Sequence, residues 1–157
     1  MRLQVRKVAV VALAVLLMLS GSAWSMGGSS ASSSTAPADP DFTKAVKAVN
    51  GADYAKAIAL LEGVVAHDPK NADAWNYLGF SNRKLRKYPE ALADYEKALA
   101  INPDHLGANE YLGELYLETG DLPKAEERLS KLDKLCIFGC EEYRTLKAAI
   151  DAKKKSG

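Results

Sequence analysis

The order of apolar and polar residues along the chain predicts a series of amphipathic helices from residue 41 onward. In the segment 89–101, for example, Ala91, Leu92, Tyr95, Ala98 and Leu99 recur at the spacing that places side chains on one face of a helix. No strand is visible in the pattern. The expected fold class is therefore all-α, with helices at 41–50, 54–67, 72–85, 89–101, 106–118, 122–135 and 141–153.

The helical pattern repeats at a fixed distance of 34 residues. This spacing separates Ala57, Ala91 and Ala125 from one another, and it also relates Pro69 to Pro103, Leu78 to Leu112, Gly79 to Gly113, Tyr54 to Tyr88 and Pro89 to Pro123. A period of this size indicates stacked supersecondary units. We expect three units, at about 38–71, 72–105 and 106–139, each made of two helices.

Small residues and prolines indicate how the two helices of a unit meet. Gly79 and Ala91 are small where two helices must approach closely, and Tyr95 is large enough to fill the space beside them. Pro89 and Pro123 fall in the first turn of a second helix, where the missing N–H costs nothing. The pattern thus predicts close helix pairs with defined starts.

The middle unit, "ADAWNYLGFSNRKLRKYPEALADYEKALAINPDH", resembles the tetratricopeptide repeat family. The signature positions hold Trp75, Leu78, Gly79, Ala91, Tyr95, Ala98 and Pro103, with Asn82 where tyrosine is usual. The resemblance implies a right-handed α-solenoid of three tetratricopeptide helix pairs, whose first helices line a concave groove that binds peptides or helices of partner proteins. The first and third units depart from the signature, which we interpret as the divergence of terminal units that face water.

A seventh helix follows the third unit. In "CEEYRTLKAAIDAKKK", Tyr143, Leu146 and Ile150 lie on one helical face, and acidic residues precede lysines in the order that suits the helix dipole. We expect this segment, about 141–153, to be a C-terminal capping helix that covers the last pair. The repeat domain would then comprise residues 41–157.

The N-terminus has the features of a secretory signal peptide. Arg2, Arg6 and Lys7 precede the apolar run 8–19, and small residues follow in "SGSAWS". A helix of that length spans about 18 Å, which is short for a permanent membrane anchor. We expect a Sec-type signal peptide at 1–25, cut after Ser25 or alternatively after Ala23, and a periplasmic or secreted protein without a stable membrane anchor.

Residues 26–40, "MGGSSASSSTAPADP", are predicted to be a flexible linker, because they carry few side chains that could repay the entropy of ordering. Removal of residues 1–25 takes away three basic and no acidic residues, which leaves 18 Lys+Arg against 20 Asp+Glu. A near-neutral chain lacks the basic stripe that nucleic-acid binding needs, so we expect no nucleic-acid partner.

Register with the family assigns eleven side chains to the groove. These are Phe42, Val46, Val49, Asn76, Phe80, Arg83, Lys84, Glu110, Glu114, Leu117 and Glu118. Tyr77 and Glu110 break the family's clamp for a C-terminal carboxylate. Two interpretations of the charges stay open, because Arg83 and Lys84 either pair with Glu114 and Glu118 or meet a partner. The sequence predicts a partner segment with apolar anchors for Phe80 and Val49 and a basic or mixed flank.

The segment "CIFGC" holds the only two cysteines, Cys136 and Cys140. In an exported protein we expect them to form a disulfide that fixes the capping helix, with Ile137 and Phe138 packed beneath it. Two alternatives remain open. The pair could be redox-active, or its thiolates could bind copper(I), although no histidine or methionine lies nearby in sequence.

No other group of residues predicts chemistry. His67 and His105 are interpreted as solvated turn residues, and Glu126 and Glu127 as surface partners of Lys124 and Arg128. We therefore expect no enzymatic activity, cofactor or metal. The sequence predicts a protein-protein interaction adaptor or scaffold in the bacterial cell envelope; the alternatives are a thiol-redox or copper-handling accessory protein that uses the cysteine pair, and self-association.

Overall fold

The computed structural model describes residues 39–156, which form seven α-helices and no strands. They are α1 (Pro40–Asn50), α2 (Tyr54–His67), α3 (Ala72–Lys84), α4 (Tyr88–Ile101), α5 (Leu106–Thr119), α6 (Leu122–Leu135) and α7 (Glu141–Ser156). The all-α prediction is confirmed, and each helix end lies within three residues of its expected place. The predicted signal peptide, 1–25, and most of the predicted linker lie outside the described residues.

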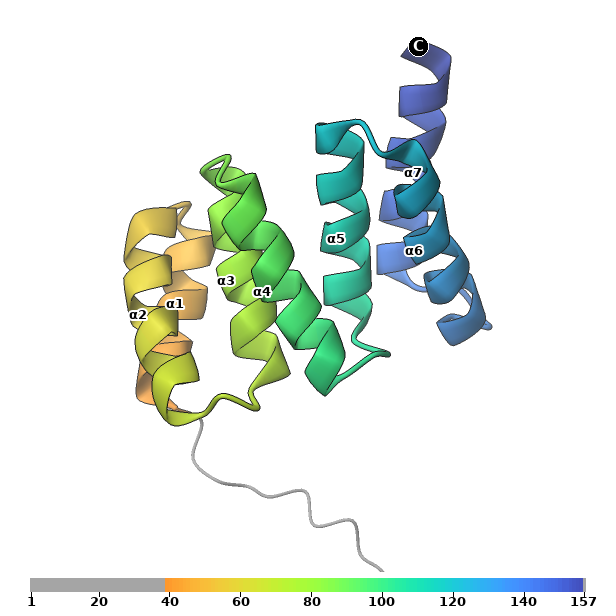
Figure 1. Ribbon diagram of the computed structural model, residues 1–157. Helices are drawn as coiled ribbons and strands as arrows, with labels where there is room; N and C mark the ends of the chain where they lie inside the picture. The colour runs from red at the N-terminus through yellow and green to blue at the C-terminus, as the bar shows by residue number, and fades with distance from the viewer. Residues whose placement is uncertain (1–38, 157) are drawn as a thin grey trace, which may run out of the picture. The chain divides into compact units, whose positions relative to one another are not determined.

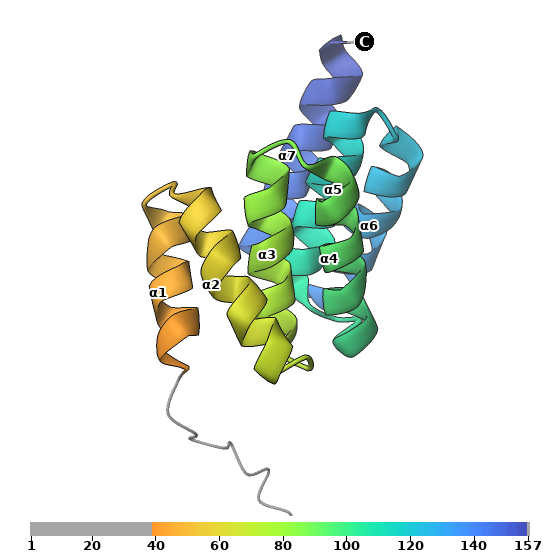
Figure 2. The ribbon, with the colours of Figure 1, turned by 60° about the vertical axis from the view of Figure 1, so that its left-hand side comes forward.

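The helices stack as pairs in chain order (Figure 1). Each first helix contacts the next first helix, as α1 does α3, α3 does α5 and α5 does α7. Within residues 39–156, by contrast, the backbones of α2, α4 and α6 do not come close to one another. The second helices are therefore spread apart, and the stack curves with α1, α3, α5 and α7 on its inner side. Figure 2 shows the same stack from another direction.

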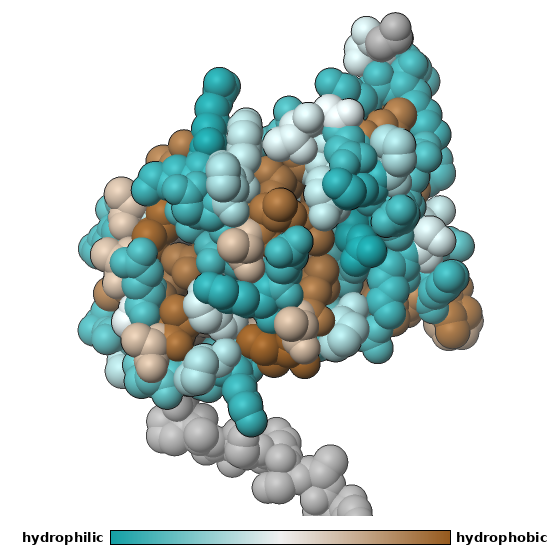
Figure 3. All heavy atoms as spheres, in the orientation of Figure 1, coloured by the Kyte–Doolittle hydropathy of each residue, from teal (hydrophilic) through white to brown (hydrophobic). Residues whose placement is uncertain are grey.

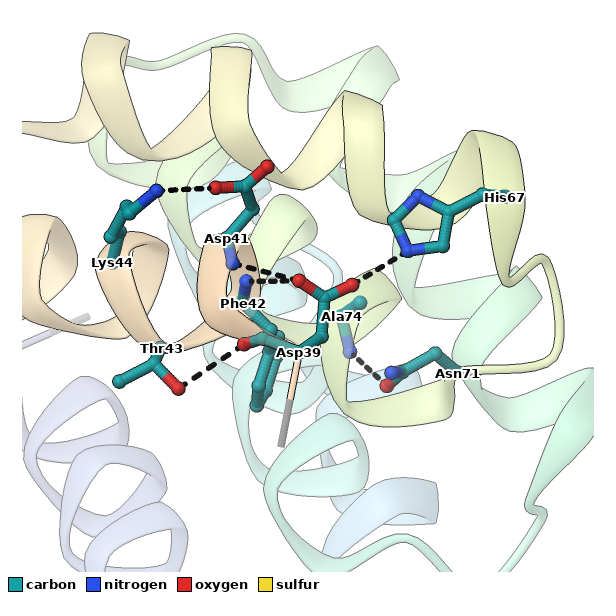
Figure 4. A network of polar contacts seen from close by, with 8 residues as sticks. All are labelled: Asp39, Asp41, Phe42, Thr43, Lys44, His67, Asn71 and Ala74. Carbon is teal, nitrogen blue, oxygen red and sulfur yellow. Dashed lines mark hydrogen bonds and ion pairs between the residues drawn. The ribbon is translucent and has the colours of Figure 1, made fainter. Parts of the chain in front are cut away.

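The start of α1 lies earlier than the predicted linker allows. The Asp39 carboxylate accepts hydrogen bonds from the backbone N–H groups of Asp41 and Phe42, which caps the helix, and its second oxygen lies 2.6 Å from Nε2 of His67 (Figure 4). This contact ties the start of α1 to the end of α2. Asp39 and Pro40 thus belong to the folded part of the chain rather than to the linker.

The close approach predicted within the middle unit is confirmed. A Cβ atom placed on Gly79 would lie 2.7 Å from Cδ1 of Tyr95, so any larger residue would collide with the ring. Tyr95 and Ala91 are fully buried. Beside them Asn82, at the usual tyrosine position, donates a hydrogen bond of 2.8 Å to Asp94. Burial raises the pKa of the Asp94 carboxyl to about 6.

Helix α7 covers the end of the stack, as the sequence predicts. Leu146 and Ile150 are buried, and a Cβ atom on Gly113 would lie 2.5 Å from Cδ2 of Leu146. In sequence, Leu146 follows Leu112 by 34 residues, the same separation as that between Leu78 and Leu112. The cap therefore has the register of a fourth first helix, and it extends the inner side of the stack. Among residues 39–156, no helix is both long and apolar enough to span a membrane.

Candidate functional site

Four aromatic side chains from three first helices form a strip on the inner side of the stack. Phe42 comes from α1, Tyr77 and Phe80 from α3, and Tyr111 from α5. The ring centroids of Phe42 and Tyr77 are 5.8 Å apart, and those of Phe80 and Tyr111 are 4.9 Å apart. All four side chains are only partly buried. We call this set the aromatic strip; the fold leaves it partly open to solvent.

Val49 does not belong to this surface. It is buried in the first hydrophobic cluster, with Ala45 and Leu61, whereas Val46 is partly exposed. The prediction that Val49 anchors a partner is therefore wrong, because the rotation of α1 places it against α2. Tyr77, which the register argument left out of the groove, takes its place in the aromatic strip.

Arg83 lies at the centre of the predicted groove and is 3% exposed. Its Nη2 lies 2.5 Å from Oε2 of Glu114, and its Nη1 lies 2.6 Å from Oε1 of Glu118. The guanidinium carbon is also 5.6 Å from the ring centroid of Phe80 and 5.7 Å from that of Tyr111. Of the two interpretations of the groove charges, Arg83 therefore follows the first: it pairs with glutamates of α5 rather than remaining free for a partner.

Lys84 behaves differently from its neighbour. Its side chain is exposed, its Nζ lies 5.0 Å from the ring centroid of Phe80, and it forms no ion pair within residues 39–156. Lys84 is therefore a basic group of α3 that remains accessible at the edge of the aromatic strip.

A hollow lies between the C-terminal halves of α3, α5 and α7. Its lining includes Lys84, Leu117 and Glu118, and α7 contributes Ala149, Ala152, Lys153 and Ser156. Sequence reasoning missed these four residues of α7, because it treated that helix only as a cap. The 34-residue spacing from Leu112 to Leu146 is the signal that could have found them.

Glu110 and Asn76 are two buried polar residues at the opposite end of the groove. Glu110 is 7% exposed, and no hydrogen bond or ion pair to it is found within residues 39–156. Burial, assisted by the charges of Glu114 and Glu142, raises its pKa to about 7. Asn76 is 5% exposed, and its Oδ1 has no partner among the described residues.

The sulfur atoms of Cys136 and Cys140 lie 2.10 Å apart, at disulfide distance. Neither thiol is free, and residues 39–156 contain no group of His, Cys, Asp and Glu side chains able to hold a metal ion. Ile137 is 81% exposed and Phe138 is 100% exposed. The expectation that they pack beneath the cysteines is wrong. The tight loop turns them outward. Figure 3 shows a small group of hydrophobic atoms at the lower right edge of the molecule, near the end of α6 as Figure 1 places it.

The two histidines differ from each other. His67 is exposed, as expected, and the hydrogen bond to Asp39 raises its pKa. His105 is mostly buried, because its Nδ1 accepts a hydrogen bond from the Ala108 N–H and caps α5. The view of His105 as a solvated residue was wrong.

The expected surface pairs on α6 are rearranged. Glu126 pairs with Lys154 of α7 at 2.6 Å. Arg128 donates to Oδ1 of Asn109 at 3.3 Å. These side chains thus tie α6 to its neighbours instead of pairing along the helix.

The helix pairs, their period and the aromatic inner side define the class as an α-solenoid repeat protein. Profiles of the tetratricopeptide repeat match residues 42–82, 72–105 and 94–127. The chain belongs to the tetratricopeptide repeat family.

Curated relatives match only in part. The chain is 31% identical over 91 residues to tetratricopeptide repeat protein 37 of Xenopus laevis. The aligned segment covers 54% of this chain and 6% of that protein. It is 36% identical over 64 residues to protein FlbA of Caulobacter vibrioides, and this aligned segment covers 41% of this chain and 11% of FlbA. This chain thus spans a small part of either relative.

Solved structures share the fold over a larger part of the chain. PcrH in complex with the chaperone-binding region of PopD superimposes with a TM-score of 0.66 and 17% identity, over 74% of this chain and 90% of that one. The TPR2B domain of yeast Sti1 in complex with pHsp70 has a TM-score of 0.68 and 16% identity, over 74% and 95%. At these identities the likeness concerns the fold alone.

Proposed function

We propose that this protein is a non-enzymatic adaptor of the bacterial cell envelope that binds a segment of a partner protein on the inner side of its helix stack. The observation that carries the proposal is the aromatic strip. Phe42, Tyr77, Phe80 and Tyr111 are large apolar or amphipathic rings that the fold leaves partly exposed on adjacent helices. Covering such a surface with a partner's apolar side chains is favourable, because it removes exposed apolar area from water.

The similar structures support this kind of partner. PcrH is in complex with a region of PopD, and the first repeat domain of RPAP3, with a TM-score of 0.64 and 20% identity, is bound to a peptide of HSP90. The chemistry of the present groove differs from a receptor for a C-terminal carboxylate, because Arg83 is already engaged by Glu114 and Glu118. We expect apolar anchors that contact Tyr77 and Phe80.

The envelope location rests on the sequence of residues 1–25. Export to an oxidising compartment also accounts for the disulfide distance between Cys136 and Cys140. We expect protein recovered from the envelope fraction to begin at Met26, which intact-mass and N-terminal peptide measurements would test. A cytoplasmic protein that retains Met1 would contradict the location.

The groove is tested by cross-linking and affinity capture from the envelope fraction. We expect Phe80→Ala and Tyr77→Ala to lose a partner that the wild type captures. Ile101→Ala is the matched control, because Ile101 is an exposed apolar residue on α4. Thermal unfolding of each variant checks that the fold is retained. Capture that persists in both groove variants would refute binding at the aromatic strip.

The same experiment addresses the cysteine pair. We expect Cys136→Ser/Cys140→Ser to retain the partner. Loss of the partner in that variant alone, together with a mixed disulfide in the wild type under non-reducing conditions, would transfer the function to the loop 136–140.

A further inference from the structure

Two polar side chains on the inner side of the stack lack a protein partner among the described residues. Oδ1 of Asn76 is buried and accepts no hydrogen bond, and the carboxylate of Glu110, in a residue that is 7% exposed, forms no hydrogen bond or ion pair. Burying a polar group without a hydrogen bond costs stability, so native proteins rarely leave such groups unpaired. Neither the core nor the capping of a helix explains these two.

The two residues face the same seam. Asn76 on α3 and Glu110 on α5 hold equivalent places, 34 residues apart, in consecutive first helices. Nδ2 of Asn76 lies 3.2 Å from the position that a Cβ atom on Gly107 would occupy. Gly107 precedes Glu110 by three residues, which is one turn on the same side of α5. The Asn76 amide therefore lies against the first turn of α5, and Glu110 follows one turn later on the same side of that helix.

The charges around Glu110 are mainly negative. Burial is the largest cause of its raised pKa, about 7, and Glu114, Glu142 and Glu141 act in the same direction. Arg83 acts in the opposite direction, but both of its terminal nitrogens are engaged by Glu114 and Glu118. The groove thus has an unpaired acidic group here, with no described cation bound to it.

Other basic groups nearby point elsewhere. Arg144 is on the first turns of α7, but its Nη1 lies 3.9 Å from the Cβ position of Gly139, at the disulfide loop. Lys84 lies about two helical turns from Asn76, over the ring of Phe80. No cation within residues 39–156 therefore neutralises the carboxylate of Glu110.

Aromatic rings complete the surroundings. Tyr77 and Tyr111 directly follow Asn76 and Glu110 in sequence, and both belong to the aromatic strip. The pKa of Tyr111 is raised to about 12 by burial and, next, by the charge of Glu110. A carboxylate, an amide oxygen and aromatic faces together are complementary to an alkylammonium or guanidinium group.

We propose that Glu110 and Asn76 receive the side chain of a lysine or arginine in the bound partner segment, with Tyr77 and Tyr111 packed against its aliphatic stem. This inference rests on the proposed function and deepens it, because it assigns a positive charge to the partner. The partner then supplies to Oδ1 of Asn76 and to the carboxylate of Glu110 the hydrogen bonds that the free protein lacks.

The test is a selection from a random-peptide phage library against the full chain. We expect the recovered peptides to share apolar residues and, at a fixed distance from them, a lysine or arginine. The same selection is made against Glu110→Gln and against Glu127→Gln, a matched change of an exposed glutamate on α6. The cationic position should be lost with Glu110→Gln and kept with Glu127→Gln.

The outcomes separate this inference from the proposed function. Peptides with apolar residues but no shared cation, or a cation unaffected by Glu110→Gln, would refute the cation site and leave the adaptor proposal standing. Failure to enrich any peptide at the inner side would contradict both. Soluble wild-type protein should compete for the enriched peptides, whereas the Tyr77→Ala and Phe80→Ala variants should not if the peptides bind at the inner side.

A synthetic peptide from the selection provides the quantitative check. Replacing its lysine by norleucine should weaken binding to the wild type by at least about tenfold and should have little effect on binding to Glu110→Gln. The loss with Asn76→Ala should be smaller than with the wild type, because that variant retains the carboxylate but lacks the amide oxygen. Calorimetry in buffers of different ionisation enthalpy should show proton release on binding near pH 7, since a bound cation favours the ionised carboxylate. An equal loss of affinity on the norleucine replacement for the wild type and for every variant would overturn the assignment. The replacement is made in the peptide, so its effect on the wild type does not depend on whether a protein variant folds.

Discussion

Arg83 is the residue whose role changes most between sequence and structure. A basic residue on a groove helix suggests a contact for a partner, yet this guanidinium is buried between Glu114 and Glu118 and against two rings. It therefore joins α3 to α5, and its contribution is to the fold of the groove rather than to the chemistry of recognition.

Replacing Arg83 tests that assignment. We expect Arg83→Met to lower the free energy of unfolding by about 2–4 kcal/mol, because it leaves two carboxylates without their shared cation. Urea denaturation measures the change. Lys147→Met removes an exposed pair with Asp151 and should leave the midpoint nearly unchanged. Equal midpoints for the two variants would contradict a structural role for Arg83.

The pH dependence of stability reports on Glu110. Its pKa is raised from 4.5 to about 7 in the folded state, so the folded protein binds a proton more tightly than the unfolded chain. Stability therefore falls as the pH rises from 4.5 through about 7.

We expect Glu110→Gln to remove this loss, on the order of 1 kcal/mol after allowance for solvent screening. The measurement is urea denaturation of wild type and variant across that pH range. The difference between them isolates Glu110 from Asp94, whose pKa is also raised. A constant difference at every pH would count against a shifted Glu110.

At the scale of elements, the loop 136–140 connects α6 to α7 and closes a short ring. A disulfide across so few residues stabilises by only about 2 kcal/mol through the entropy of the unfolded chain. Its effect should be local, because α7 contacts α5 and α6 but neither α1 nor α2.

We expect Cys136→Ser/Cys140→Ser to lower stability by about 2 kcal/mol and to speed amide hydrogen exchange in α7 while leaving α1 and α2 unchanged. Phe138→Ser is the control. Since Phe138 is fully exposed, it should change stability by no more than about 0.5 kcal/mol. A large loss with Phe138→Ser would restore the interpretation that this ring packs inside.

At the scale of the whole stack, each helix contacts only its near neighbours in chain order. Repeat proteins of this kind have stabilities that add from units and from the interfaces between them. A change at one end should therefore weaken that end first.

Leu146→Ala is expected to cost about 3 kcal/mol, because Leu146 is fully buried against Gly113 in the cap interface. Hydrogen exchange should increase in α5, α6 and α7 and much less in α1 and α2. Leu61→Ala, a buried leucine of α2, should give the opposite distribution. Uniform acceleration in both variants would show instead that the stack unfolds as a single cooperative unit.

Local patterns in the sequence determined the elements. The 3.6-residue periodicity, prolines in first turns and residues such as Asp53 and Asp121, whose side chains cap the next helix, are properties of a few neighbouring residues. The 34-residue period then fixed the pairing of helices, the close contact of Gly79 with Tyr95 and the position of the cap. These predictions needed no knowledge of distant contacts.

The tertiary structure alone decided which groove residues remain free. Whether Arg83 meets Glu118, 35 positions away, or a partner depends on the distance and rotation between α3 and α5. The same rotations bury Val49, leave Oδ1 of Asn76 without a hydrogen-bond partner, and place α7 along the hollow. The loop geometry turns Phe138 outward. Periodicity defines the face of a helix, but side-chain partners depend on how neighbouring faces pack, and that packing is set by the whole stack.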